Sequence, residues 1–124
     1  MRAYTELPEL AEIVLEESFV LGVAARPGAV VFDIEFVLTP RHPGYAPPSS
    51  SERECFRRGT LGFVGVRRLE WSEQGLRPAI DATGEIDYGH IDSFEWDDGR
   101  FVLSGDWGRA DIEAAGIETT LRPE

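Results

Sequence analysis

The sequence predicts a mostly β protein: an antiparallel sandwich, or a strongly curved sheet, of six to seven strands with a short N-terminal helix. Apolar and polar residues alternate over residues 30–38, which is typical of a strand with one buried face. Two turn signals, Pro27-Gly28 and Asp98-Gly99, each separate two strand-like stretches, as hairpins require. With 124 residues, the chain has the size of a single domain over residues 1–124.

The first part of the chain is expected to contain the helix and a hairpin. Residues 5–12 combine a capping-type threonine, an early proline and acidic residues, which permits one or two helical turns. The next strand is expected to turn at residues 25–29 and to pair with residues 30–38. Its apolar side chains share the odd positions, namely Ile13, Leu15, Phe19, Leu21 and Val23. The buried face of its partner is formed by even positions, namely Val30, Phe32, Ile34, Phe36 and Leu38.

The middle of the chain is expected to be a long loop followed by a strand. Residues 40–53 contain four prolines and three consecutive serines, so we expect them to form an exposed loop. Residues 54–71 return to a strand pattern. Within it, Gly59, Gly62 and Gly65 indicate a bulge, a bend or the close approach of another backbone.

The last third shows the clearest hairpin, at residues 94–103, because Asp-Gly supplies the positive backbone angles of a tight turn. Residues 110–121 fit either a helix or a bulged strand. The alternation of Ile117, Thr119 and Leu121 favours the strand.

Composition limits the function classes. There are 23 acidic against 12 basic residues, and a net charge of −11 opposes binding to nucleic acid. The same charge favours a basic protein partner, although solubility alone also explains it. No stretch approaches the roughly 20 apolar residues that span a membrane, and the N-terminus lacks a secretory pattern. A single cysteine, Cys55, excludes an internal disulfide and argues against a thiolate-based zinc site, so we expect a cytoplasmic protein. No cofactor is expected.

An acidic segment at residues 80–92 is the one stretch that resembles a site. The residues predicted to contact a partner are Asp87, Tyr88, His90, Asp92, Asp106 and Trp107. Trp107 joins this set because neighbouring glycines place it where a sheet ends, whereas the other tryptophans follow a core-filling pattern. No catalytic residue is assigned, because Cys55 is expected to be a buried, inert thiol.

Two metal-binding hypotheses concern the same segment. Oxygen-bearing side chains between Asp81 and Asp92 resemble a calcium loop, but Ile86 occupies the glycine position and no flanking helix is predicted. The alternative function is a small metal- or ligand-binding enzyme or sensor that uses His42, His90 and nearby carboxylates. It requires the fold to bring together two histidines that lie 48 residues apart.

The order of elements resembles small bacterial β proteins of the toxin-immunity type. The shared features are a strand pair ending in residues 32–36, a proline-rich loop, an aromatic strand at residues 61–66 and a late acidic segment. The resemblance implies a non-enzymatic protein that binds and blocks a basic partner through acidic loop residues. We therefore expect a non-catalytic binding domain, with residues 40–53 as a second contact region. A homodimer formed through a wet strand face or an uncovered edge strand is a third hypothesis.

Overall fold

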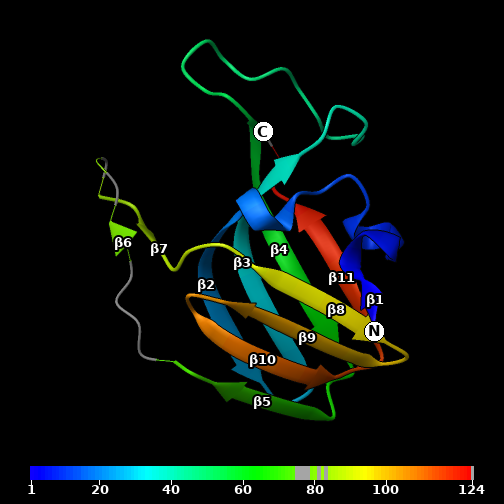
Figure 1. Cartoon of the computed structure of the whole chain (residues 1–124). Helices are drawn as coiled ribbons and strands as arrows, with labels where there is room; N and C mark the ends of the chain where they lie inside the picture. The colour runs from blue at the N-terminus through cyan, green and yellow to red at the C-terminus, as the bar shows by residue number, and fades with distance from the viewer. Residues whose placement is uncertain (75–78, 81, 83, 124) are drawn as a thin grey trace.

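The computed structural model describes residues 1–74, 79–80, 82 and 84–123, and it places two antiparallel sheets face to face (Figure 1). One sheet has the order β1 (Arg2–Ala3), β8 (Ser93–Asp97), β9 (Arg100–Gly105), β10 (Gly108–Glu113) and β5 (Arg68–Ser72). The other has the order β11 (Gly116–Leu121), β4 (Cys55–Val64), β3 (Ala29–Leu38) and β2 (Phe19–Arg26). A small ribbon of β6 (Ala79–Ile80) and β7 (Ile86–Asp87) lies beside them.

The mostly β, antiparallel architecture is confirmed, but the chain forms more strands than the predicted six to seven. Part of the difference comes from the two-residue strands β1, β6 and β7, which are too short to show an alternating pattern. The rest comes from residues 54–71 and residues 110–121, each of which divides between the two sheets. Residues 54–71 form β4 and β5, and Gly65, with a φ of 62°, makes the bend between these two strands.

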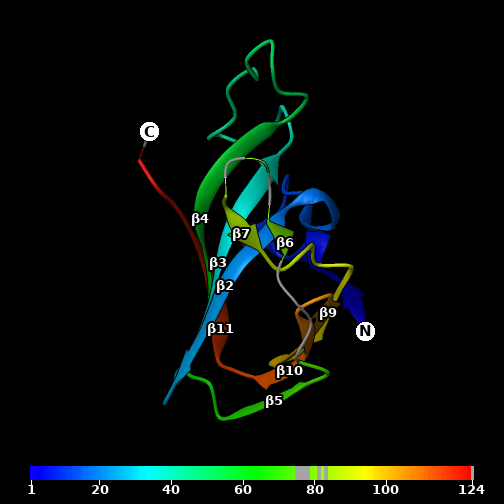
Figure 2. The same cartoon turned by 90° about the vertical axis from the view of Figure 1, so that its left-hand side faces the viewer.

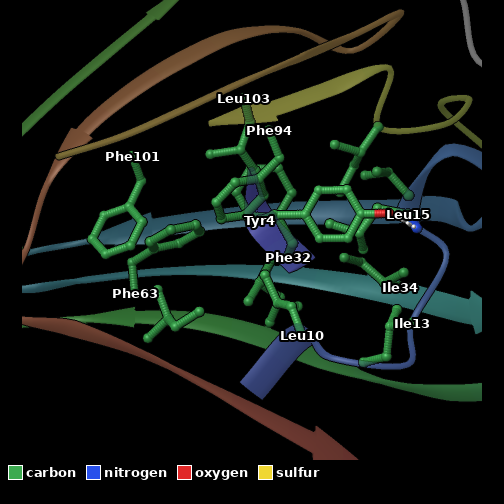
Figure 3. Packing of buried hydrophobic residues seen from close by; sticks show 14 of the residues in the cluster. Tyr4, Leu10, Ile13, Leu15, Phe32, Ile34, Phe63, Phe94, Phe101 and Leu103 are labelled. Carbon is green, nitrogen blue, oxygen red and sulfur yellow. Dashed lines mark hydrogen bonds between the residues drawn. The ribbon is translucent and has the colours of Figure 1, made fainter. Parts of the chain in front are cut away.

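The predicted helix at residues 5–12 does not form in the described chain, and this prediction is wrong. Residue Leu7 is extended, as the residue before Pro8 usually is, so a continuous helix cannot pass through it. Three short 3₁₀ turns take its place, η1 (Tyr4–Glu6), η2 (Pro8–Leu10) and η3 (Leu15–Glu17). Each directs one side chain into the core, and these are Tyr4, Leu10 and Leu15 (Figure 3).

The prediction for the first strand is wrong in two respects, its start and its buried face, and the second follows from a β-bulge between Val20 and Gly22. The strand begins at Phe19 rather than at residue 13, and its apolar side chains do not share one odd face. Val20 is fully buried in the core, whereas Phe19 lies opposite Glu35 on the outer face of the sheet. The bulge adds one residue on this strand, which changes the face on which later side chains lie.

The core lies between the two sheets and confirms the predicted buried face of β3. All five even positions from Val30 to Leu38 are at most 3% exposed. Aromatic rings from both sheets meet there, with Phe63 of β4 edge-on to Phe101 of β9 at a centroid distance of 5.4 Å (Figure 3). Residues 110–121 form the strands β10 and β11, so the strand interpretation is confirmed and the helix alternative is wrong.

The two sides of the sandwich differ. On one side the N-terminal turns cover the sheet edges, where Thr119 Oγ1 donates a hydrogen bond to the Glu9 carbonyl at 3.0 Å. Trp96 Nε1 likewise donates to the Ala3 carbonyl at 2.9 Å. Figure 2 views the opposite side, where β2 is the edge strand of the four-stranded sheet, and β5, the edge strand of the other sheet, runs along the bottom of that view. We call this the open side.

An ion pair on the outer face of the five-stranded sheet makes stability depend on pH. Asp111 is 4% exposed and accepts hydrogen bonds from Arg100 Nε at 3.0 Å and Nη2 at 2.6 Å. These bonds, together with the positive charge, hold the pKa of Asp111 below its ordinary value. A depressed folded pKa stabilises the native state above the unfolded pKa of about 3.9, and this stabilisation is lost as the pH falls through the folded pKa.

We therefore expect Asp111→Asn to unfold at lower urea concentration than the wild type at pH 7. The difference between the two should shrink as the pH falls below about 4, because the Asp111 carboxylate is then protonated first in the unfolded state and, at lower pH, in the native state as well. Urea unfolding at pH 7 and pH 3 measures this, with Glu95→Gln on the exposed face of β8 as the control. An equal difference at both pH values would contradict the assignment.

Candidate functional site

The acidic segment is held against both sheets on the open side. Tyr88 N–H donates to the Val20 carbonyl at 2.8 Å, and Val20 N–H donates to the Gly89 carbonyl at 2.8 Å. Asp92 N–H then donates to the Ser104 carbonyl of β9 at 2.8 Å. Residues 88–92 of the segment therefore pair with β2 at its bulge and continue into the opposite sheet, so the backbone of this part is anchored at the edge.

His90 has a structural role in this arrangement. Its Nδ1 lies 2.7 Å from the Ser18 carbonyl, and its ring packs on Phe19 at a centroid distance of 4.5 Å. The His90 carbonyl accepts a hydrogen bond from Trp107 Nε1 at 3.1 Å. The side chain is half-buried. These contacts fix the histidine between β2 and the end of β9.

The structure gives His42 different surroundings from those of His90. His42 Nδ1 accepts a hydrogen bond from Gly44 N–H at 2.9 Å, in the loop after β3. Partial burial and the nearby charge of Arg57 lower the pKa of this histidine. Among the described residues, no three histidine, cysteine, aspartate or glutamate side chains gather as a metal site requires. Asp81 of the calcium-loop pattern lies outside the described residues.

A cleft of about 300 Å³ opens between the edges of β2 and β5. Its lining residues are Leu21, Gly22, Val23, Trp71, Gln74, Tyr88 and Trp107. We call it the aromatic cleft. Trp71 Nε1 donates to the Trp107 carbonyl at 3.2 Å, and Trp107 Nε1 donates to His90, so both indole N–H groups are satisfied within the protein. The indoles therefore present mainly apolar surface to this space.

A second cleft of about 150 Å³ lies beside the first. Its lining residues are Phe19, Leu21, Glu35, Glu85 and Asp87. We call it the acidic cleft. Arg58 lies next to it, with guanidinium nitrogens 3.9 Å from Glu85 Oε1 and 3.7 Å from Asp33 Oδ2. Asp33 Oδ1 is buried and accepts no hydrogen bond from the described part of the chain.

Most of the predicted contact residues lie close to these clefts. Asp87 lines the acidic cleft, Tyr88 lines the aromatic cleft, and His90 packs on Phe19. Asp106 is exposed beside Gly89, where a Cβ atom would lie 2.8 Å from Asp106 Oδ2.

Trp107 also lines the aromatic cleft, whereas Asp106 and Asp92 line neither cleft. Trp107 is 4% exposed, so only the part of its indole at the aromatic cleft is accessible to a ligand. Asp92 is exposed next to β9 but lines neither cleft.

Phe19 and Glu35 line the acidic cleft, but neither was predicted from the sequence as a site residue. Glu35 carried a signal, because it occupies the wet face of the alternating strand at residues 30–38. Phe19 carried none, since the alternation alone places it in the core. No described residue of the loop at 40–53, the predicted second contact region, lines either cleft. Cys55 is buried, as predicted, and its Sγ lies 3.5 Å from Ala46 N–H.

The fold and the open side together define a small antiparallel β-sandwich with two adjoining clefts at one edge. Searches found no matching protein-family model, no curated protein with significant similarity and no solved structure that resembles the chain. In the described chain, no helix has the length and apolar character needed to cross a membrane.

Proposed function

We propose that this protein is a non-catalytic binding domain whose acidic cleft receives a cationic side chain of a basic protein partner, as an immunity-type protein would. One observation carries the proposal. Glu35, Glu85 and Asp87 line a cleft that half-buried Phe19 also lines. An arginine or lysine side chain matches both features, because its charge pairs with carboxylates and its cation is attracted to an aromatic face.

The charge balance around the cleft supports a cationic ligand. Glu35, Glu85 and Asp87 line the cleft, and the Arg58 guanidinium beside it lies near both Glu85 and Asp33. A cation placed in the cleft is attracted by each of the carboxylates that line it. The net charge of −11 extends the attraction beyond the cleft and would accelerate the approach of a basic partner.

Binding of a tetra-arginine peptide to two charge-matched variants tests the proposal. Glu35→Gln combined with Asp87→Asn removes two charges at the cleft. Glu95→Gln combined with Asp97→Asn removes two charges from the exposed end of β8 in the other sheet. Two partly buried charge contacts together contribute about tenfold in affinity, so we expect that loss for the cleft variant.

The control variant should change the dissociation constant by less than about twofold at 0.15 M salt, where exposed charges are largely screened. Isothermal titration calorimetry measures both variants under identical conditions. Equal weakening in the two would show that the peptide responds only to overall charge, and the proposed site would then be rejected.

A further inference from the structure

We infer that the aromatic cleft is a second subsite for the same partner and takes a planar aromatic side chain next to the cationic one. This inference rests on the proposed function, since it assumes that the acidic cleft holds the basic residue. It adds a chemical description of the partner: a short extended segment in which an aromatic residue neighbours an arginine or a lysine.

The two clefts adjoin along the bulged part of β2. Leu21 lines both of them. The consecutive residues Asp87 and Tyr88 line one cleft each, with Asp87 at the acidic cleft and Tyr88 at the aromatic cleft. Because neighbouring residues of this chain reach both spaces, neighbouring side chains of a bound segment can occupy both as well.

The walls of the aromatic cleft suit a ring rather than a charge. Its described lining contains the side chains of Trp71, Tyr88 and Trp107 and no charged group. Both indole N–H groups donate to carbonyls of the protein, and Gln74 Nε2 donates to the Trp71 carbonyl at 3.4 Å. A ligand therefore meets aromatic rings and aliphatic side chains beside a comparable amount of uncharged polar surface, which suits a planar aromatic group.

The location of the cleft suits an extended peptide. It lies between β2 and β5, the edge strands on the open side (Figure 2). An aromatic side chain buried in such a pocket is the usual anchor of a protein interface, and the charged contact beside it sets orientation and association rate. The acidic cleft supplies that charged contact, so charge complementarity selects a basic partner for both subsites.

Two tetrapeptides separate this inference from the proposed function. The first is tetra-arginine, and the second carries phenylalanine in place of its second arginine. Although the second peptide has one charge fewer, burial of its ring should make it bind about tenfold more tightly. The measurement uses Trp96→Phe, because its remaining tryptophans, Trp71 and Trp107, both line the aromatic cleft. Their fluorescence should change with the phenylalanine peptide and not with tetra-arginine.

Two variants locate the ring. Tyr88→Ala removes one wall of the aromatic cleft, and Val23→Trp fills the space from β2. In each, the affinities for the two peptides should converge. Calorimetry measures the affinities, and circular dichroism confirms that each variant is folded. If Tyr88→Ala does not fold, Val23→Trp alone tests the location of the ring.

The outcomes are distinct. A phenylalanine peptide that binds the wild type no more tightly than tetra-arginine overturns this inference and leaves the proposed function standing. The inference is also overturned if the gain persists in both cleft variants. If Glu35→Gln with Asp87→Asn leaves tetra-arginine binding unchanged, the proposed function fails, and the paired-subsite inference fails with it.

Discussion

Replacing Trp107 with alanine is expected to lower the free energy of unfolding by about 3–5 kcal/mol, the range for large aromatic side chains removed from a core. The indole is 4% exposed and meets Phe32 edge-on at a centroid distance of 5.0 Å. Its Nε1 also donates to the His90 carbonyl at 3.1 Å. The alanine variant loses the apolar contacts and leaves that carbonyl without its donor.

Urea unfolding of three variants distinguishes these contributions. Trp107→Phe keeps most of the apolar volume but removes the hydrogen bond, so we expect a loss of about 1–2 kcal/mol. Trp96→Phe is the matched control, because Trp96 is only half-buried and donates to the Ala3 carbonyl near the N-terminus. It should cost less than about 1 kcal/mol. A Trp107→Ala variant as stable as the control would show that this indole is not a core anchor.

The burial of Trp107 also changes the interpretation of the predicted contact residues. The sequence places Trp107 between glycines at the end of a strand, and this position is consistent with an exposed binding residue. In the structure the tight turn at Asp106 and Trp107 directs the indole inward, where it joins β9 and β10 to the acidic segment. Its main contribution is therefore to hold His90 and its neighbours against the sandwich.

The sequence predicted those parts of the fold that depend only on residues close together in the chain. Alternation in β3 reports burial of one face directly, since successive side chains of a strand point to opposite sides. The Asp98-Gly99 turn requires positive φ angles at both positions, and they are 35° and 86°. These features involve residues that are close in the chain, so a single sequence is sufficient to recognise them.

The features that were missed depend on contacts between distant residues. The bulge at Val20 lies where residues 88–89 pair with β2, and no sequence pattern within β2 predicts it. Phe19 and Glu35 become neighbours only through that register. The acidic cleft is therefore a product of strand pairing, which explains why the sequence indicated Asp87 but not the residues opposite it.

Substitution of Gly59 in β4 gives the second large expected effect. Gly59→Ala should lower the free energy of unfolding by about 2–3 kcal/mol, as overpacking a filled interior typically does. A Cβ atom at this position would lie 2.1 Å from the carbonyl oxygen of Thr120. That oxygen belongs to the backbone of β11, so the clash is relieved only if β4 and β11 separate and their ladder weakens.

Gly62→Ala is the matched control in the same strand and against the same neighbour. Its nearest atom would be Glu118 Cγ at 3.5 Å, an ordinary contact with a flexible side chain. Since alanine restricts the unfolded chain more than glycine does, this variant should be neutral or more stable by about 0.5 kcal/mol. Urea unfolding compares the two under the same conditions. The sequence indicated a bulge, a bend or close backbone approach at these glycines without distinguishing between them. Equal stability changes would mean that space for a Cβ atom is not what keeps glycine at position 59.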